Sequence, residues 1–141
     1  MAAISIGSGV TITSSGSVVN VGVAGETGIV AGSAIYKKVS DSRWYLAQAT
    51  VNMTDSTVVS AVGIALTPAA AIADAVVHTS SNNAVVNLGT SLSDKSKHYC
   101  ITTNGTLAEY SDLASSSYLS WWGFSNGTNF VLYPQHTGVT K

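Results

Sequence analysis

The chain has 141 residues, of which 45% are hydrophobic and only 9% are charged. This length suits one domain with a buried core, but the charged fraction is far below the roughly 25% of typical soluble domains. Six basic residues against seven acidic ones give no cationic field, which argues against nucleic acid as a partner. The single cysteine, Cys100, excludes an internal disulfide, and we expect it to pack as a small apolar side chain.

The N-terminal region and the most apolar stretch argue against export and membrane insertion. No basic residue precedes Lys37, so the beginning of the chain does not resemble a secretory signal. The most apolar stretch, residues 58–77, is broken by Pro68 and Asp74. It therefore lacks the uninterrupted apolar span of a membrane helix, and we expect no membrane partner.

Residues 1–24 are predicted to form an extended N-terminal arm. Apolar residues alternate there with Ser and Thr, which is the period-two pattern of extended chain; they are Ile4, Ile6, Val10 and Ile12. The segment contains no aromatic residue and little from which a core could form. An arm that lies on a neighbouring subunit fits this pattern better than a separate domain does.

Residues 25–141 are predicted to form an all-β body. After a turn at residues 25–28, strands are expected over residues 29–38, 43–49, 58–66, 76–79, 84–88, 98–102, 106–110, 118–124 and 130–133. Asn104-Gly105 and Asn126-Gly127 are strong hairpin signals, because both residue types tolerate positive φ, and residues 80–83 are a third hairpin candidate. Residues 68–74 fit either one helical turn or a loop across the end of a barrel. This spacing favours a small antiparallel β-barrel, tulip-like in shape, or a sandwich domain.

The sequence offers little from which to build an enzyme or a metal site. Residues 123–127 match the G-x-S-x-G nucleophile elbow around Ser125, but that motif needs a strand-to-helix turn and a downstream acid. No acidic residue follows Asp112, and the segment fits a hairpin instead. The three histidines, His78, His98 and His136, are too scattered for a local metal motif, although one could meet its copies on a trimer axis. We therefore predict no catalytic residue, no cofactor and no bound metal.

The aromatic residues near the C-terminus are the main candidates for a binding surface. Trp121 and Trp122 must point to opposite faces of one strand, so one is expected in the core and one outside. The outer tryptophan, with Tyr118, Phe124 and Tyr133 nearby, fits either a sugar-stacking platform or the apolar centre of a subunit contact. The scarcity of charge favours the contact. Four further residues are predicted to belong to the core, namely Trp44, Tyr45, Ile64 and Leu66.

The order of short segments along residues 25–139 resembles a known family. These segments are Gly25-Glu-Thr-Gly28, Ala31-Gly-Ser-Ala-Ile-Tyr36, Ser40-Asp-Ser-Arg-Trp-Tyr45, Val62-Gly-Ile-Ala-Leu66, Leu88-Gly-Thr-Ser-Leu92, His98-Tyr99, Asn104-Gly-Thr-Leu107, Tyr118-Leu-Ser-Trp-Trp-Gly-Phe124 and Gly138-Val139. The progression is similar to that of the decoration (cement) proteins of tailed-bacteriophage capsids. The pair Trp121-Trp122 departs from the family pattern, in which a small residue is more usual, and residues 1–24 have no counterpart.

The resemblance implies a compact β-barrel or tulip-like fold without catalytic residues. It further implies a homotrimer on the outer surface of the virion, where it stabilises contacts between subunits of the major capsid protein. For that function we predict that contacts to capsid or subunit are made by Ile4, Ile6, Val10, Ile12, Trp121 and Trp122. Related modules also occur in head and tail fibres, so a receptor-binding module with an aromatic glycan-binding surface is the alternative.

Overall fold

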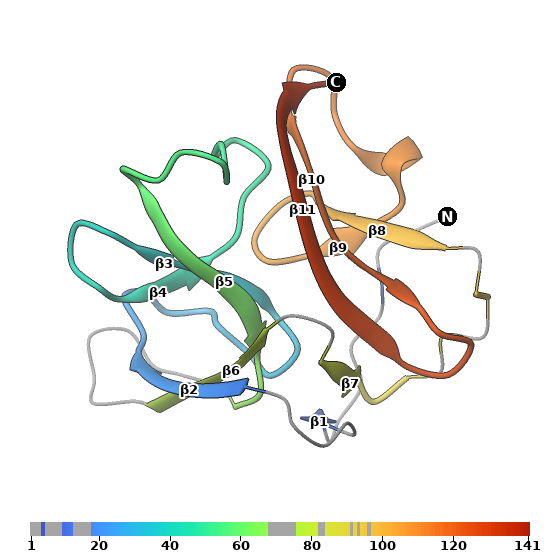
Figure 1. Cartoon of the computed structure of the whole chain (residues 1–141), viewed down its shortest axis with the longest axis horizontal. Coiled ribbons are helices and arrows are strands. Elements are labelled where there is room, and N and C mark those ends of the chain that lie inside the picture. Colours follow the sequence, from blue (N-terminus) through green and yellow to red (C-terminus); the bar gives the residue numbers. More distant parts are fainter. Residues whose placement is uncertain are drawn as a thin grey trace.

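The computed structural model describes residues 4, 10–12, 18–67, 76–81, 84–90, 92, 94–95 and 97–141. Eleven strands form two antiparallel sheets over these residues, and the helical content is one 3-10 turn, η1 (Tyr110–Asp112). The predicted all-β fold is therefore confirmed (Figure 1). Within the same residues, no helix is long and apolar enough to cross a membrane.

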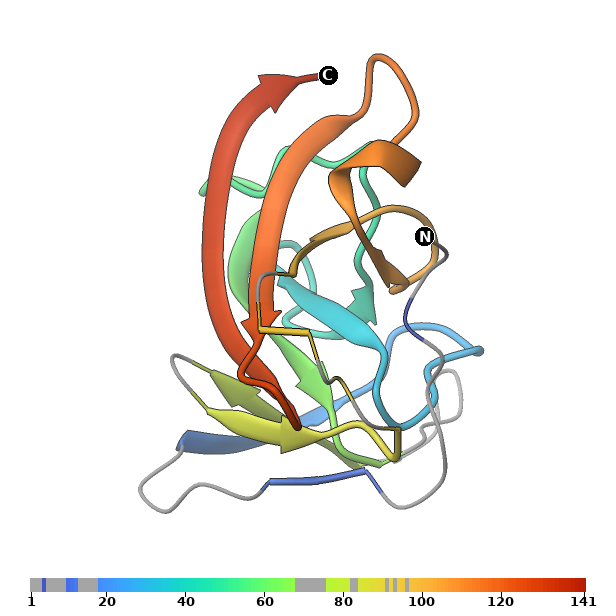
Figure 2. The ribbon, with the colours of Figure 1, turned by 90° about the vertical axis from the view of Figure 1, so that its right-hand side faces the viewer.

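The first sheet, sheet A, has the strand order β1-β7-β11-β10-β8-β9. Its strands are β1 (Thr11–Ile12), β7 (Val85–Asn87), β11 (Phe130–Thr140), β10 (Tyr118–Ser125), β8 (His98–Ile101) and β9 (Leu107–Ala108). The hairpin of β10 and β11 dominates this sheet and curves along one side of the molecule (Figure 2).

The second sheet, sheet B, has the order β2-β6-β5-β3-β4 and curls toward closure. Its strands are β2 (Val18–Val23), β6 (Val76–Ser81), β5 (Val59–Ala65), β3 (Ala34–Lys38) and β4 (Trp44–Leu46). Ala24, directly after β2, forms a parallel bridge with Trp44 of β4, and the amide of Gly25 donates a hydrogen bond to the Trp44 carbonyl. The two edges of sheet B therefore meet, and the sheet becomes a small, nearly closed barrel.

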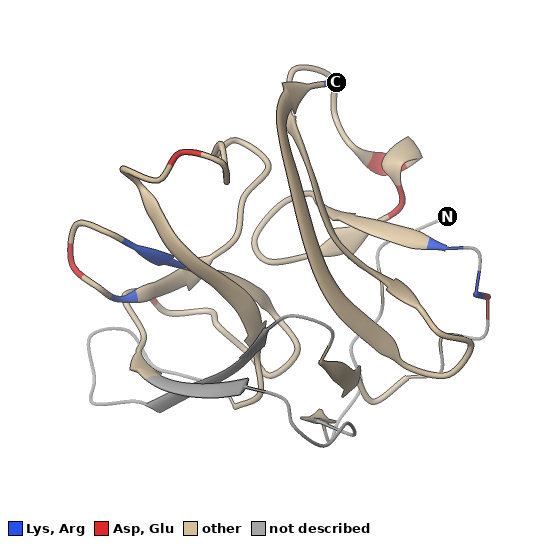
Figure 3. Ribbon diagram, in the orientation of Figure 1, with Lys and Arg blue, Asp and Glu red and all other residues tan. Residues whose placement is uncertain are grey.

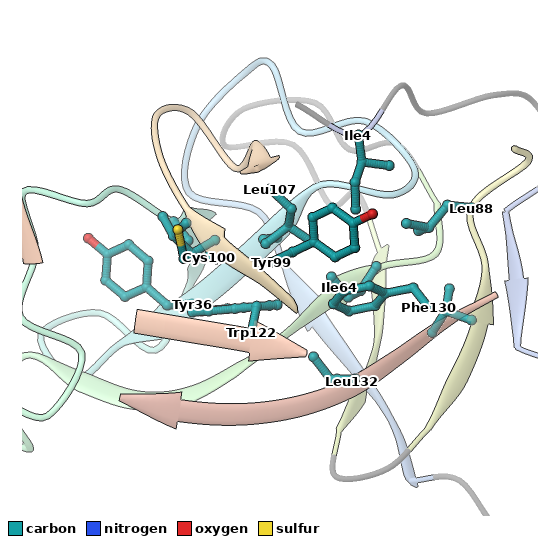
Figure 4. Close-up of a cluster of buried hydrophobic side chains, with 14 of the residues drawn as sticks. Ile4, Tyr36, Ile64, Leu88, Tyr99, Cys100, Leu107, Trp122, Phe130 and Leu132 are labelled. Atoms are coloured by element: carbon teal, nitrogen blue, oxygen red, sulfur yellow. The ribbon is translucent and has the colours of Figure 1, made fainter. Parts of the chain in front are cut away.

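The main core lies between the two sheets. Tyr36 and Ile64 from sheet B pack in one cluster with Tyr99, Trp122 and Phe130 from sheet A (Figure 4). Trp122 is fully buried, and its indole Nε1 donates a hydrogen bond of 3.2 Å to the carbonyl of Gly63 in β5. This bond joins the two sheets and satisfies the indole N–H, which would otherwise be buried without a partner.

A second core fills the interior of the curled sheet B. Side chains alternate between the two faces of sheet B along β3, so Ala34 and Tyr36 face the main core while Ile35 points into this second core. Ile35 packs there in a cluster with Ala24, Ile29, Trp44, Leu46 and Ala65. Of the four residues predicted to be core, Trp44 and Ile64 are buried, whereas Tyr45 and Leu66 are half-buried against the main cluster.

The two Asn-Gly hairpins are confirmed. Asn104 and Gly105 both have positive φ, 49° and 73°, and they connect β8 to β9. A side chain at position 105 would lie 2.8 Å from the carbonyl oxygen of Ala34, so Gly is required there for space as well as for φ. At the other hairpin, which connects β10 to β11, the side-chain oxygen of Asn126 accepts hydrogen bonds from the backbone amides of Thr128 and Asn129.

The hairpin predicted around residues 80–83 is wrong. Strand β6 pairs with β2 and β5 in sheet B, whereas β7 pairs with β1 and β11 in sheet A. The chain crosses between the sheets at this point, and a cluster of Ser and Asn does not distinguish a crossing from a tight turn. The ambiguous residues 68–74 lie outside the described residues.

Two strands within residues 1–24 belong to the two sheets. Strand β1 pairs with β7, and all six residues of β2 pair with β6. The amide of Ile4 donates a hydrogen bond to the carbonyl of Leu107, which lies at the edge of sheet A. Within one chain, β2 is therefore a full strand of sheet B. A contact between residues 1–24 and a neighbouring subunit stays a prediction.

Candidate functional site

Five aromatic rings form a continuous row on the outer face of sheet A, which is the face turned away from sheet B. In spatial order these residues, which we call the aromatic row, are Tyr110, Trp121, His98, Phe124 and Tyr133. Consecutive ring centroids lie 6.3, 6.3, 5.6 and 6.3 Å apart. The row therefore crosses β8, β10 and β11, and its first ring comes from η1.

A β-bulge in β10 places two of these rings on the same face. Trp121 pairs with Cys100, but Gly123 pairs with Tyr99, so two steps along β10 match one step along β8. Trp122 points into the main core, and the extra residue shifts the alternation so that Phe124 faces outward beside Trp121. Without the bulge, strict alternation would direct Phe124 into the core.

The bulge depends on Gly123. A side chain at this position would overlap the backbone carbonyl of Val131 and the ring of Phe130, both in the neighbouring strand β11. Only glycine lets β10 and β11 approach this closely. The choice of glycine at position 123, directly before the outward-facing Phe124, is therefore fixed by packing.

The aromatic row is accessible and lies on uncharged strands. Three of its rings are exposed, namely His98 and the two end rings, Tyr110 (43%) and Tyr133 (44%). Neither β10 nor β11 contains a charged residue (Figure 3). Lys141 follows β11 and holds one end of the row, because its Nζ donates to the carbonyls of Tyr110 and Leu113 and lies 4.6 Å from the centre of the Tyr110 ring.

The structure divides the predicted tryptophan pair as expected. Trp122 is fully buried, and Trp121 is half-buried on the outer face. Of the aromatic residues expected near Trp121, Phe124 and Tyr133 belong to the row, whereas Tyr118 makes none of the row's ring contacts. Trp122 is thus a core residue of the chain and has no surface with which to contact a partner.

Sequence reasoning missed two members of the row, His98 and Tyr110. His98 is placed by its pairing with Phe124, and Tyr110 by the 3-10 turn that folds back over β8. The alternation in β8, where Tyr99 and Ile101 face the core, is the one sequence signal that could have identified His98 as outward-facing.

The four N-terminal contact candidates have different positions. Ile4 and Val10 are both 8% exposed and belong to the main core. In this arrangement they stabilise the fold and offer almost no surface to a partner. Ile12 lies in β1, and Ile6 lies outside the described residues.

The groups with possible chemical reactivity have structural roles. Ser125 is buried, and its Oγ donates to the carbonyl of Leu92 and accepts from the amide of Gly127. It lies at the end of a strand that enters a hairpin, so it lacks the strand-to-helix turn of a nucleophile elbow.

Burial raises the pKa of the Cys100 thiol to about 11, which keeps the thiol protonated. Among the described residues, no three His, Cys, Asp or Glu side chains are grouped as metal ligands.

His136 is a titratable group that lies against the main core. Its ring lies 5.4 Å from that of Trp122, and its Nδ1 is buried with no hydrogen-bond partner among the described residues. Burial lowers the pKa of this imidazole and favours its neutral form.

Comparison with known proteins identifies no relative. No family model matches the chain, and neither a curated protein nor a solved structure is similar to it.

Proposed function

We propose that this protein is a capsid decoration (cement) protein of a tailed bacteriophage. In this function it binds the outer surface of the virion as a homotrimer and stabilises contacts between subunits of the major capsid protein. The observation that supports the proposal best is the aromatic row, a line of three exposed and two half-buried rings on a sheet face whose longest strands carry no charge.

The composition of this face suits a contact with another protein. Interface cores are depleted of charged residues and enriched in Trp, Tyr and Phe, and truncation of such aromatic side chains gives the largest losses of binding energy. The rings of the row also contact one another, so they are already held in place before a partner arrives. Less conformational entropy is then lost on binding.

The mechanism of stabilisation is thermodynamic. A protein that binds only the assembled lattice stabilises that lattice by mass action, and attachment through several copies of a trimer strengthens the binding. The trimer and the capsid partner rest on the resemblance of residues 25–139 to the decoration family. No enzymatic activity belongs to this proposal.

Binding to capsids that lack this protein tests the proposal. Replacing both exposed ends of the row, Tyr110→Ala with Tyr133→Ala, should weaken co-sedimentation with such capsids at least tenfold, since a hot-spot aromatic contributes about 1–2 kcal/mol or more. The matched control is Val39→Ala, which removes an equally exposed apolar side chain (45%) after β3 in sheet B. Equal binding of the double variant and the control would refute the assignment of the row.

The alternative is a fibre module that binds host glycans. The same row favours it, because flat, accessible rings also stack on the apolar faces of sugars. A fibre module should bind host cells as an isolated protein and should ignore capsids that lack it. Cell binding without capsid binding would replace the decoration proposal with this alternative.

A further inference from the structure

A hollow of about 290 Å³ lies between the β8–β9 hairpin and the segment that follows η1. Its volume is close to the lower end of the range found for small-molecule sites. The hairpin contributes Thr102 and Thr106, and the segment after β9 contributes Asp112, Ala114 and Ser117. The hollow is thus built from two stretches of chain that the fold brings together, and the second of them pairs with the C-terminal residue, because the amide of Lys141 donates to the carbonyl of Ser117.

The hollow shares the outer face of sheet A with the aromatic row. Cys100, which pairs with both Trp121 and Ala108, has the same orientation in β8 as His98. Ala108, which lines the hollow, is therefore on the same side of the sheet as Trp121. Tyr110, the first ring of the row, and Asp112 are both in η1, so one short turn contributes to both features.

Polar groups line the hollow without being used by the fold. The carboxylate of Asp112 and the hydroxyls of Thr106 and Ser117 have no hydrogen-bond partner among the described residues. The hydroxyl of Thr102 donates to the carbonyl of Thr106, which leaves its lone pairs as acceptors. Hydroxyls that can donate or accept therefore surround one acceptor with a full charge.

Apolar groups complete the lining. Ala108 and Leu113 are buried, and Ala114 is exposed at the side of the hollow. The position of Leu113 is fixed by its carbonyl, which accepts a hydrogen bond of 2.7 Å from Lys141, and by its amide, which donates to Tyr110. Because Ala108 and Leu113 are buried, the accessible part of the hollow combines one small apolar side chain, Ala114, with unengaged hydroxyl and carboxylate groups.

We propose that this hollow binds one ring of a neutral sugar. A pyranose has an apolar face of C–H groups, which can lie on the exposed Ala114 methyl group, and a rim of hydroxyls, which matches the hydroxyl and carboxylate groups of the lining. The Asp112 carboxylate would accept hydrogen bonds from two neighbouring sugar hydroxyls, which are charge-assisted and therefore strong. The inference does not depend on the proposed capsid function.

The lining disfavours other small ligands. It contains one negative charge and no cationic side chain, so phosphate, sulfate and acidic sugars would find no cationic partner in it. A calcium ion takes six to eight oxygen ligands, usually from several carboxylates, whereas a single carboxylate lines this hollow. A neutral polyol is the ligand class whose groups match those that are present.

The test is a titration of the ¹⁵N-labelled full chain with methyl glycosides of glucose, galactose, mannose and N-acetylglucosamine, followed by NMR. At least one glycoside should shift the amide signals of residues 102–106 and 112–117 with a saturable dependence on concentration. Asp112→Asn and Ala114→Leu, which remove the charge and fill the hollow, should each raise the Kd at least tenfold. Ser115→Leu changes an exposed residue of the same segment outside the lining and should leave the Kd unchanged.

Three results would overturn the proposal. One is the absence of saturable shifts in these residues with all four glycosides, and another is an unchanged Kd for Ala114→Leu. The third is a set of shifts confined to the aromatic row, which would assign sugar binding to the row and not to the hollow. The first two outcomes leave the capsid proposal unaffected, because the capsid assay uses variants of Tyr110 and Tyr133, whereas shifts confined to the row would favour the glycan-binding alternative.

Discussion

Replacing Gly123 with alanine should destabilise the whole fold by an amount that follows from the β10 bulge. The new methyl group would overlap the carbonyl oxygen of Val131 and the ring of Phe130. A side chain could rotate away, but a backbone carbonyl in a paired strand cannot, so β10 and β11 must separate. Overpacking usually costs about 1–3 kcal/mol, and we expect about 3 kcal/mol here because the obstacle is backbone.

For a chain of this length, that loss corresponds to a decrease in Tm of about 10 °C. Urea denaturation monitored by tryptophan fluorescence would measure the free energy of unfolding. The matched control is Gly28→Ala, where φ is +92° and the nearest atom, Cδ1 of Leu46, lies at an ordinary 3.7 Å. This control carries only the backbone penalty, about 1–2 kcal/mol. If Gly123→Ala cost no more than the control, the close approach of β10 and β11 would be refuted.

Three further predictions concern buried polar groups. Burial lowers the pKa of His136 from its ordinary 6.5, so as the pH falls the unfolded chain binds a proton before the folded chain does. The free energy of unfolding should therefore be constant above about pH 6.5 and decrease below it. In urea denaturation, His136→Phe should reduce this pH dependence, whereas the control variant His98→Gln, at an exposed site, should retain it. Cys100, whose thiol pKa is raised to about 11 by burial, should react with a disulfide reagent only when the chain unfolds, and rapid labelling of the native protein would contradict its burial. Ser125→Ala should lower the free energy of unfolding by about 1–2 kcal/mol in thermal unfolding, because it leaves the buried Leu92 carbonyl without its donor. The same variant should leave any background ester hydrolysis unchanged, and loss of hydrolysis would contradict a purely structural role for Ser125.

The features that were predicted from the sequence are those with a local cause. The Asn104-Gly105 turn needs two residues that tolerate positive φ, and both have it. Trp121 and Trp122 lie on opposite faces because neighbouring residues of a strand must.

The features that were not predicted depend on residues far apart in the chain. The separation of β6 and β7 into different sheets is decided by which partners each strand finds, and alternation within one strand carries no such information. The bulge at Gly123 exists through its register with Tyr99 and Leu132. The aromatic row depends on that bulge, so its composition could not be read from spacing alone.

The burial of Ile4 and Val10 has the same kind of cause. Alternating apolar residues indicate a strand with one covered face, but they do not indicate whether the same chain or a neighbour covers that face. In this protein the chain itself covers Ile4 and Val10, since both side chains belong to its main core.

The central claim is that this protein stabilises a capsid, and heat-induced release of the genome tests it most directly. Virions with the protein, virions lacking it, and virions lacking it but supplied with the purified chain would be heated in parallel while the released DNA is measured. The proposal predicts release at a lower temperature without the protein, recovery with the wild-type chain, and weaker recovery with the variant carrying Tyr110→Ala and Tyr133→Ala. An identical release temperature in all samples would contradict the proposed function.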